Sequence, residues 1–137
     1  MLIGTGKNIT LNAVAYVLDP NENAYSIYLN KFNDYSKKNN LNIEINLNLL
    51  SSDNSTISTE DYGSMIEATM KKTKDIKYHI YFYDNLYSSK YGPHLLNLEK
   101  YLTQDHINMY DSRILDNTCY YKNILVGLVC LLLISWI

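Results

Sequence analysis

The stretch LNIEINLNL, residues 41–49, decides the fold class because its side chains alternate between apolar and polar. Leu and Ile occupy the odd positions, whereas Asn and Glu occupy the even ones. Successive side chains of a strand point to opposite faces, so this pattern predicts a strand with one apolar and one polar face. The segments on both sides change to helical spacing, which makes this strand one member of an alternating α/β pattern.

Upstream, the sequence predicts a buried strand followed by a helix. Residues 9–18, ITLNAVAYVL, are apolar and rich in β-branched side chains, and Asp19-Pro20-Asn21 ends the run. Residues 22–39 then carry aromatic and apolar side chains three or four positions apart, with Asn21 as the expected N-cap and Lys37-Lys38 in the last turn. The expected buried stripe of this helix consists of Tyr25, Tyr28, Leu29, Phe32 and Tyr35.

Downstream, a polar loop over residues 50–57 leads into a second helix, capped by Ser58 or Thr59. Its expected buried stripe contains Tyr62, Met65, Ile66, Thr69 and Met70, and lysines end it from Lys71 onward. The stretch KYHIYFYDN, residues 77–85, then predicts a third strand over about 78–84.

This order predicts an α/β fold: a three-layer βαβαβ lobe with a mainly parallel sheet. Ligands of open α/β sheets gather at the carboxyl ends of the strands, so the loops at residues 19–22, 50–58 and 84–91 should share one edge. This edge would hold Asp19, Ser51, Ser52, Asp53, Asp84, Asn85 and Tyr87.

The C-terminal part is expected to hold short elements and an apolar end. A short helical turn or a loop is expected over 85–92, an apolar surface over 95–102 and a short capped helix in TQDHINMYDS. Residues 124–137 are nearly all apolar but fall short of the ~20 residues that a membrane-spanning helix needs. Three interpretations stay open for them: a core strand, the truncated end of a longer protein, or a membrane-associating segment.

Composition argues against a nucleic-acid partner, since the net charge is −2, the pI is about 5.8 and no basic stripe appears. The N-terminus does not have the pattern of a secretory signal. The sequons at Asn8 and Asn54 would be glycosylation sites only on a secretory route. Cys119 and Cys130 either form a disulfide or stay as free thiols.

No spacing of catalytic or metal-ligating residues stands out. His79, His94 and His106 are scattered, and neither a P-loop nor a nucleophile elbow is present, so no enzyme activity, metal or cofactor is expected. Asp19 and Asp84 would each follow a strand, as acids of a catalytic pair or of a phosphoacceptor receiver domain do. The receiver domain is the weaker alternative because the adjacent second acid and the required Lys are missing, and both Asp could simply start turns.

In this order, the segments resemble the N-terminal lobe of extracellular solute-binding proteins of the sugar-transporter type (family 1), in a shortened form of the kind found in eukaryotic chains. The similar phrases are KFNDYSKKNNLNIEINLNLL (31–50), EDYGSMIEATMKK (60–72), KYHIYFYD (77–84), GPHLLNLEKYL (92–102) and YYKNILVGLV (120–129). The sequence departs from the family pattern at Val129, where a Pro is expected.

The resemblance implies a partial lobe of the type II periplasmic-binding-protein fold over residues 9–128, with an apolar tail over 129–137. It implies a non-enzymatic module that binds a sugar or small polar solute, outside the cell or at a membrane, and that lacks the second lobe. An ectodomain fragment of a receptor with seven membrane helices is the alternative. Positions at predicted strand ends give the candidate ligand contacts, which are Tyr16, Asp84, Asn85 and Tyr87.

Overall fold

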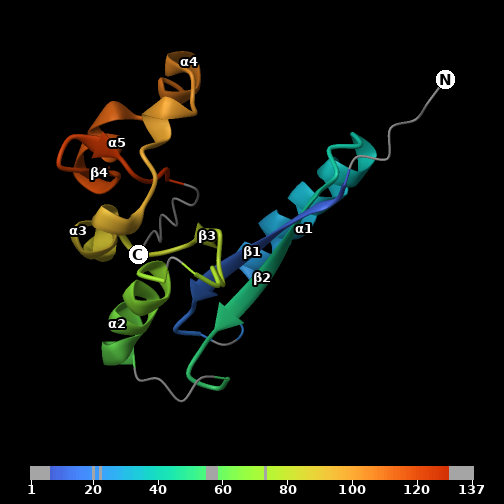
Figure 1. The fold of residues 1–137 in the computed structure, drawn as a ribbon, viewed down its shortest axis with the longest axis horizontal. Coiled ribbons are helices and arrows are strands. Elements are labelled where there is room, and N and C mark those ends of the chain that lie inside the picture. The colour runs from blue at the N-terminus through green and yellow to red at the C-terminus, as the bar shows by residue number, and fades with distance from the viewer. Residues whose placement is uncertain (1–6, 20, 22, 55–58, 73, 130–137) are drawn as a thin grey trace, which may run out of the picture. The chain divides into compact units, whose positions relative to one another are not determined.

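The computed structural model describes residues 7–19, 21, 23–54, 59–72 and 74–129 (Figure 1). The chain divides between Tyr83 and Asp84 into two compact units. A single lobe over residues 9–128 stays a prediction.

The first unit is a βαβαβ arrangement around a three-stranded parallel sheet (Figure 1). Its elements are β1 (Ile9–Tyr16), α1 (Ala24–Lys38), β2 (Ile43–Leu50), α2 (Thr59–Met70) and β3 (Ile80–Tyr81). The strand order is β2-β1-β3, and both pairings are parallel. The predicted α/β class and parallel sheet are therefore confirmed.

The pairing of β1 with β2 follows from their matched apolar positions. The register runs from Ile9 opposite Ile43 to Tyr16 opposite Leu50, so that Leu11 lies beside Ile45 on the same face. β1 is the central strand, and its residues 13–15 are fully buried. The alternation in residues 41–49 thus predicted β2 correctly, with its polar positions exposed and its apolar ones half-buried.

The third strand is shorter than predicted, with two residues instead of the expected 78–84. Before it, side chains replace part of the backbone ladder with β1. The backbone N–H of Asn12 donates to Nδ1 of His79 over 3.0 Å, and the Asn12 amide donates to the carbonyl of Lys77 over 3.3 Å. Regular pairing therefore begins only at Ile80, which lies opposite Ala13.

Helix α1 begins later than predicted, and its N-cap is Asn23, without a side-chain cap hydrogen bond. Asn21 is not the N-cap, because its backbone N–H and its side-chain amide both donate to Oδ1 of Asp19. Lys37 and Lys38 lie in the last turn, as predicted.

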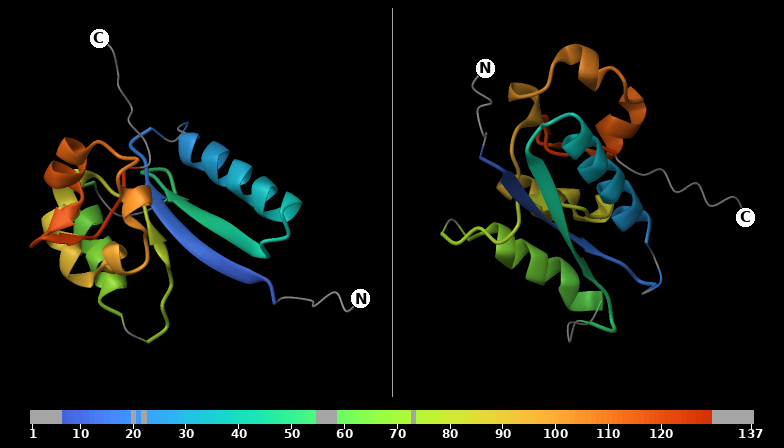
Figure 2. Two further views of the ribbon diagram at one scale, coloured as in Figure 1. Left: turned by 90° about the horizontal axis from the view of Figure 1, so that it is seen from above. Right: turned by 90° about the vertical axis from the view of Figure 1, so that its right-hand side faces the viewer.

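The expected buried stripe of α1 is partly wrong, because Tyr28 and Tyr35 are more than half exposed while Ser36 is buried. The helix lies along β2, and β2 lies between α1 and β1 (Figure 2). A helix beside an edge strand meets backbone groups as well as apolar side chains, so its buried side can contain polar residues.

Helix α2 matches its prediction closely. Tyr62 and Ile66 are buried, and Met65, Thr69 and Met70 are half-buried. The helix ends at Met70, just before the lysines expected to end it. Ser58, one of the two predicted caps, lies outside the described residues.

The second unit consists of short elements around its own core. These are η1 (Asn85–Tyr87), α3 (Ser88–Tyr91), η2 (Gly92–His94), η3 (Leu98–Lys100), α4 (Gln104–Ile107), α5 (Ser112–Thr118), β4 (Tyr120–Tyr121) and β5 (Ile124–Leu125). The core contains Ile107, Leu115, Cys119 and Leu125, and Leu98, Leu102, Tyr110, Tyr120, Leu128 and Val129 pack against it. The helical turn over 85–92 and the capped helix after residue 102 are confirmed, the latter as α4 with Thr103 as N-cap.

The sequence patterns did not predict α5 or the antiparallel β4–β5 hairpin. Lys122 and Asn123 connect the two strands with φ angles of 47° and 62°, a conformation that a two-residue hairpin turn requires. Residues 124–129 belong to this unit, whereas residues 130–137 of the apolar tail lie outside the described part of the chain. None of the described helices is long and apolar enough to cross a bilayer.

Candidate functional site

The carboxyl edge of the sheet in the first unit begins where β1 ends, at Tyr16. Val17 still donates to the carbonyl of Leu50 over 2.9 Å, which keeps the ends of β1 and β2 together. Asp19 then closes a tight turn by accepting two hydrogen bonds from Asn21, at 2.9 and 3.0 Å. The carboxylate of Asp19 is therefore engaged by Asn21.

Tyr16, a predicted ligand contact, packs against helix α2. Its ring lies 4.4 Å from the ring of Tyr62, centroid to centroid, at an angle of 36°. The hydroxyl oxygen of Tyr16 is buried and has no hydrogen-bond partner among the described residues. A buried hydroxyl without a hydrogen-bond partner lowers the stability of the fold, so its presence at this edge calls for an explanation.

A second aromatic pair lies at the same edge of the sheet. Phe82 follows β3 directly, and its ring lies 5.1 Å from the ring of Tyr25 in the first turn of α1. Phe82 also donates its backbone N–H to the carbonyl of Val14 in β1, over 2.9 Å. Sequence reasoning assigned Tyr25 to the helix core and did not identify it as an edge residue.

The loop after β2 is held together by its own polar side chains. Asn54 accepts from the N–H of Ser51 and donates to the carbonyl of Leu49, both at 2.8 Å. Ser51 is buried, and its hydroxyl accepts from the N–H of Asp53. Asn54 and Asn8, the two predicted glycosylation positions, are both exposed, and their modification stays a prediction.

The other predicted contacts, Asp84, Asn85 and Tyr87, lie together in one turn of the second unit. Asp84 is the N-cap of η1, and its Oδ1 accepts from the N–H of Leu86 over 2.9 Å. Asp84 and Asn85 are exposed, whereas Tyr87 is half-buried and stacks on Tyr91 with 5.2 Å between ring centroids. The carboxylate of Asp84 thus has a local structural role, and its role as a ligand contact stays a prediction.

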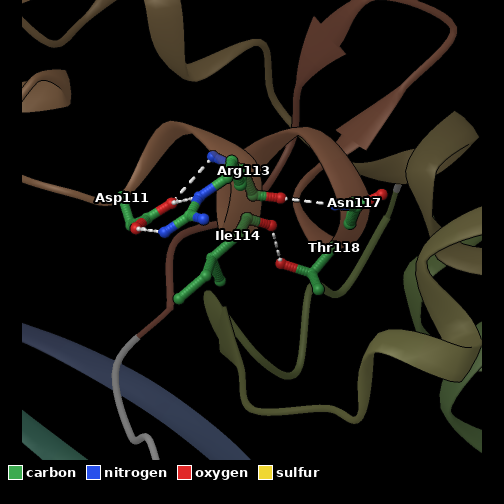
Figure 3. Close-up of a pocket in the computed structure, with 5 residues that line it drawn as sticks. All are labelled: Asp111, Arg113, Ile114, Asn117 and Thr118. Atoms are coloured by element: carbon green, nitrogen blue, oxygen red, sulfur yellow. Dashed lines mark hydrogen bonds and ion pairs between the residues drawn. The ribbon is translucent and has the colours of Figure 1, made fainter.

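An open hollow of about 360 Å³ lies along α5 in the second unit (Figure 3). Asp111, Arg113, Ile114, Asn117 and Thr118 line it. Their polar side chains are already engaged: Asp111 pairs with Arg113 at 3.1 Å, Asn117 donates to the carbonyl of Arg113, and Thr118 donates to the carbonyl of Ile114. The polar groups that line the hollow are therefore already hydrogen-bonded within this segment, and the hollow is open to solvent.

The ion pair on this surface shifts the ionisation of both partners. Hydrogen bonds from the guanidinium and the backbone N–H of Arg113 lower the pKa of Asp111. The same side-chain contact raises the pKa of Arg113. Sequence reasoning missed this pair, although an Asp directly before a helix, as Asp111 is before α5, is a recognisable N-cap signal.

Two other side chains of reactive types, His79 and Cys119, make contacts within the fold. His79 is exposed, and its Nδ1 accepts from the backbone of β1, as described above. Cys119 is a free, buried thiol that lies 3.3 Å from the hydroxyl of Thr118, whereas Cys130 lies outside the described residues. Within the described part of the chain, no group of three or more His, Cys, Asp or Glu side chains could hold a metal ion.

No family model matches the chain, and no curated protein or solved structure matches it significantly. The fold and the local geometry are therefore the basis for a functional proposal.

Proposed function

We propose that this chain is a non-enzymatic binding module for a sugar or another small polar solute, similar to the first lobe of extracellular solute-binding proteins. The observation that carries the proposal is the strand order β2-β1-β3 in a parallel sheet. Strand β2 lies on one side of β1 within the sheet and β3 on the other, so the strand order changes direction at β1. Sheets of this kind bind ligands at the carboxyl ends of the two strands where the direction changes, which here are β1 and β3.

Aromatic side chains at this edge support a polar, ring-shaped ligand. The pair Tyr16–Tyr62 lies at the end of β1, and the pair Tyr25–Phe82 lies at the end of β3. Tyr62 is buried, so the half-buried rings of Tyr16, Tyr25 and Phe82 are the ones that could meet a ligand. Aromatic faces offer flat apolar surfaces for sugar rings. Tyr16 is our first candidate contact, because it ends β1 at the carboxyl edge of the sheet and its ring is half-buried.

The turn with Asp84, Asn85 and Tyr87 supplies a second set of candidate contacts, to be tested separately. Asp84 and Asn85 expose polar side chains, and Tyr87 adds an aromatic ring. A carboxylate, an amide and a phenol are the side-chain types that exchange hydrogen bonds with hydroxyl-rich ligands.

Proteins of this class bind solute between two lobes that close by a hinge. One lobe contacts a ligand from one side only, so we expect weak, millimolar binding by this chain alone. A receptor ectodomain is a second form of the same proposal, in which the same site would serve signalling.

Calorimetry with a panel of monosaccharides and disaccharides on the full chain tests the proposal. We expect at least one sugar to bind, and Asp84→Asn to weaken it while keeping the cap acceptor of η1. Asp111→Asn is the matched control, because Asp111 is also exposed and also accepts from the backbone N–H two residues on, at 2.9 Å. Equal binding by both variants would remove Asp84 from the site, and no binding by any sugar would refute the sugar-binding function.

A further inference from the structure

Strand β2 forms one edge of the sheet, and alternate residues direct their backbone groups outward. Ile9 donates to the carbonyl of Asn42 over 2.8 Å, and Val17 donates to that of Leu50 over 2.9 Å. In a parallel ladder, this register directs the backbone groups of the even-numbered residues of β2 toward β1. Both the N–H and the C=O of Ile43, Ile45 and Leu47 therefore point away from the sheet.

Two side chains of α1 bind these outward groups, and we call them the edge latch: Asn33 and Ser36. The amide of Asn33 accepts from the N–H of Ile45 and donates to its carbonyl, both at 2.9 Å. The hydroxyl of Ser36 accepts from the N–H of Ile43 over 3.2 Å and donates to its carbonyl. Ser36 is only 1% exposed, so water cannot readily replace it.

The sequence of the covered edge is complementary to itself in antiparallel orientation. With a two-fold axis at Ile45, Ile43 lies opposite Leu47, and Glu44 lies opposite Asn46. Apolar residues then meet apolar ones, and the negative charge of Glu44 does not face its own copy. The outward backbone groups of Ile43, Ile45 and Leu47 also match the hydrogen-bonded pairs of an antiparallel ladder.

We propose that the outer edge of β2 is a pairing site for β2 of a second copy of this chain, and that the edge latch on α1 competes with that pairing. Exposed strand edges are templates for association, and proteins commonly cover or interrupt them. Asn33 and Ser36 occupy the two positions, Ile45 and Ile43, that the second copy would use. Release of α1 from β2 thus converts a closed edge into a homodimer interface.

The test compares the full-length wild type with the double variant Asn33→Leu, Ser36→Ala by light scattering after gel filtration, over a series of concentrations. Loss of four competing hydrogen bonds should lower the dimer dissociation constant roughly tenfold or more. Asn30→Leu is the matched control, because Asn30 is exposed on the same helix. It should associate no more than the wild type.

A second substitution tests the register of the pairing. Leu47→Pro removes an outward N–H without removing a donor to β1, and proline is tolerated at such edge positions. In the double variant, it should restore the monomer. Persistence of the dimer with Leu47→Pro, or a folded double variant that stays as monomeric as the wild type, would overturn the proposal. If circular dichroism shows that the double variant is unfolded, Ser36→Ala alone replaces it, and a folded, fully monomeric Ser36→Ala would likewise count against pairing.

Discussion

At the scale of single residues, three aspartates of this chain bind their own backbone. Asp19, Asp84 and Asp111 each accept a hydrogen bond from the backbone N–H two residues on, at 2.9 Å. A carboxylate in such a turn accepts from a backbone N–H that has no backbone carbonyl as partner. Sequence reasoning could place Asp19 and Asp84 after strands, but the residue type alone does not distinguish a turn from a ligand contact.

The pair of Asp111 with Arg113 leads to a prediction about pH. Because the folded-state pKa of Asp111 is lowered, its ionised form stabilises the fold above the unfolded pKa, and this contribution is lost as the pH falls through the folded pKa. NMR titration of the side-chain carboxyl should show Asp111 titrating below the usual range of Asp. Arg113→Gln should return the pKa toward that range, and an unchanged titration would contradict the assignment to Arg113.

Gly92 leads to a prediction about packing in the second unit. A Cβ atom at this position would lie 2.4 Å from Cγ of Tyr121 in β4, so the ring would have to move. Gly92→Ala should lower the free energy of unfolding by about 1–3 kcal/mol in urea denaturation, since overpacking forces neighbours out of position.

A double-mutant cycle provides the control for Gly92. In a Tyr121→Ala background the clash is removed, so the cost of Gly92→Ala should shrink. An equal cost in both backgrounds would mean that the clash with Tyr121 is not its cause.

At the scale of elements, local hydrophobic periodicity correctly predicted the strands and helices whose apolar pattern lies within one segment. The alternation of residues 41–49 and the stripe of α2 were correctly interpreted, because each is visible within one segment. The buried side of α1 was not, since Asn33 and Ser36 are buried by hydrogen bonds to β2, a distant partner that no helical period reveals. At its N-terminal end, strand β3 was predicted too long for a similar reason, because side chains of Asn12 and His79 replace part of the ladder there, while the N–H of His79 still donates to the carbonyl of Asn12.

The contact of His79 with β1 leads to a prediction for this edge of the sheet. Nδ1 of His79 accepts from the backbone N–H of Asn12, and Oδ1 of an asparagine occupies nearly the same place relative to the backbone. His79→Ala should lower the free energy of unfolding by about 0.5–1.5 kcal/mol, whereas His79→Asn should restore most of the loss. Urea denaturation of both variants tests this, and equal losses would show that the acceptor atom does not matter.

At the scale of the whole molecule, the sequence was sufficient for the βαβαβ order and insufficient for the second unit. In the first unit, β1, α1, β2 and α2 are long enough for their hydrophobic periodicity to be visible. The alternation of strands and helices then predicts a parallel sheet. The second unit consists of helices and strands of two to seven residues, held by the core around Ile107, Leu115, Cys119 and Leu125. Elements of this length have no detectable period, so only their turns and caps could be predicted.

For the candidate site, the order of elements predicted contacts at the strand ends, and the role of those residues in binding stays a prediction. Strand ends gave Tyr16 and Asp84, because the rule for parallel sheets needs only the order of elements. The stacking of Tyr16 on Tyr62 and the contact of Tyr25 with Phe82 depend on packing between elements far apart in the sequence. These contacts give the proposed solute site its aromatic character.

The most direct test of the binding proposal is an NMR titration of the isotope-labelled full chain with the sugar panel. We predict saturable changes in the amide shifts of Tyr16, Val17 and Phe82, at the ends of β1 and β3, while the amides of α5 stay unchanged. Tyr16→Phe should weaken these changes, because the hydroxyl at the end of β1 is lost. The absence of saturable shifts with every sugar, or shifts confined to α5, would contradict the account.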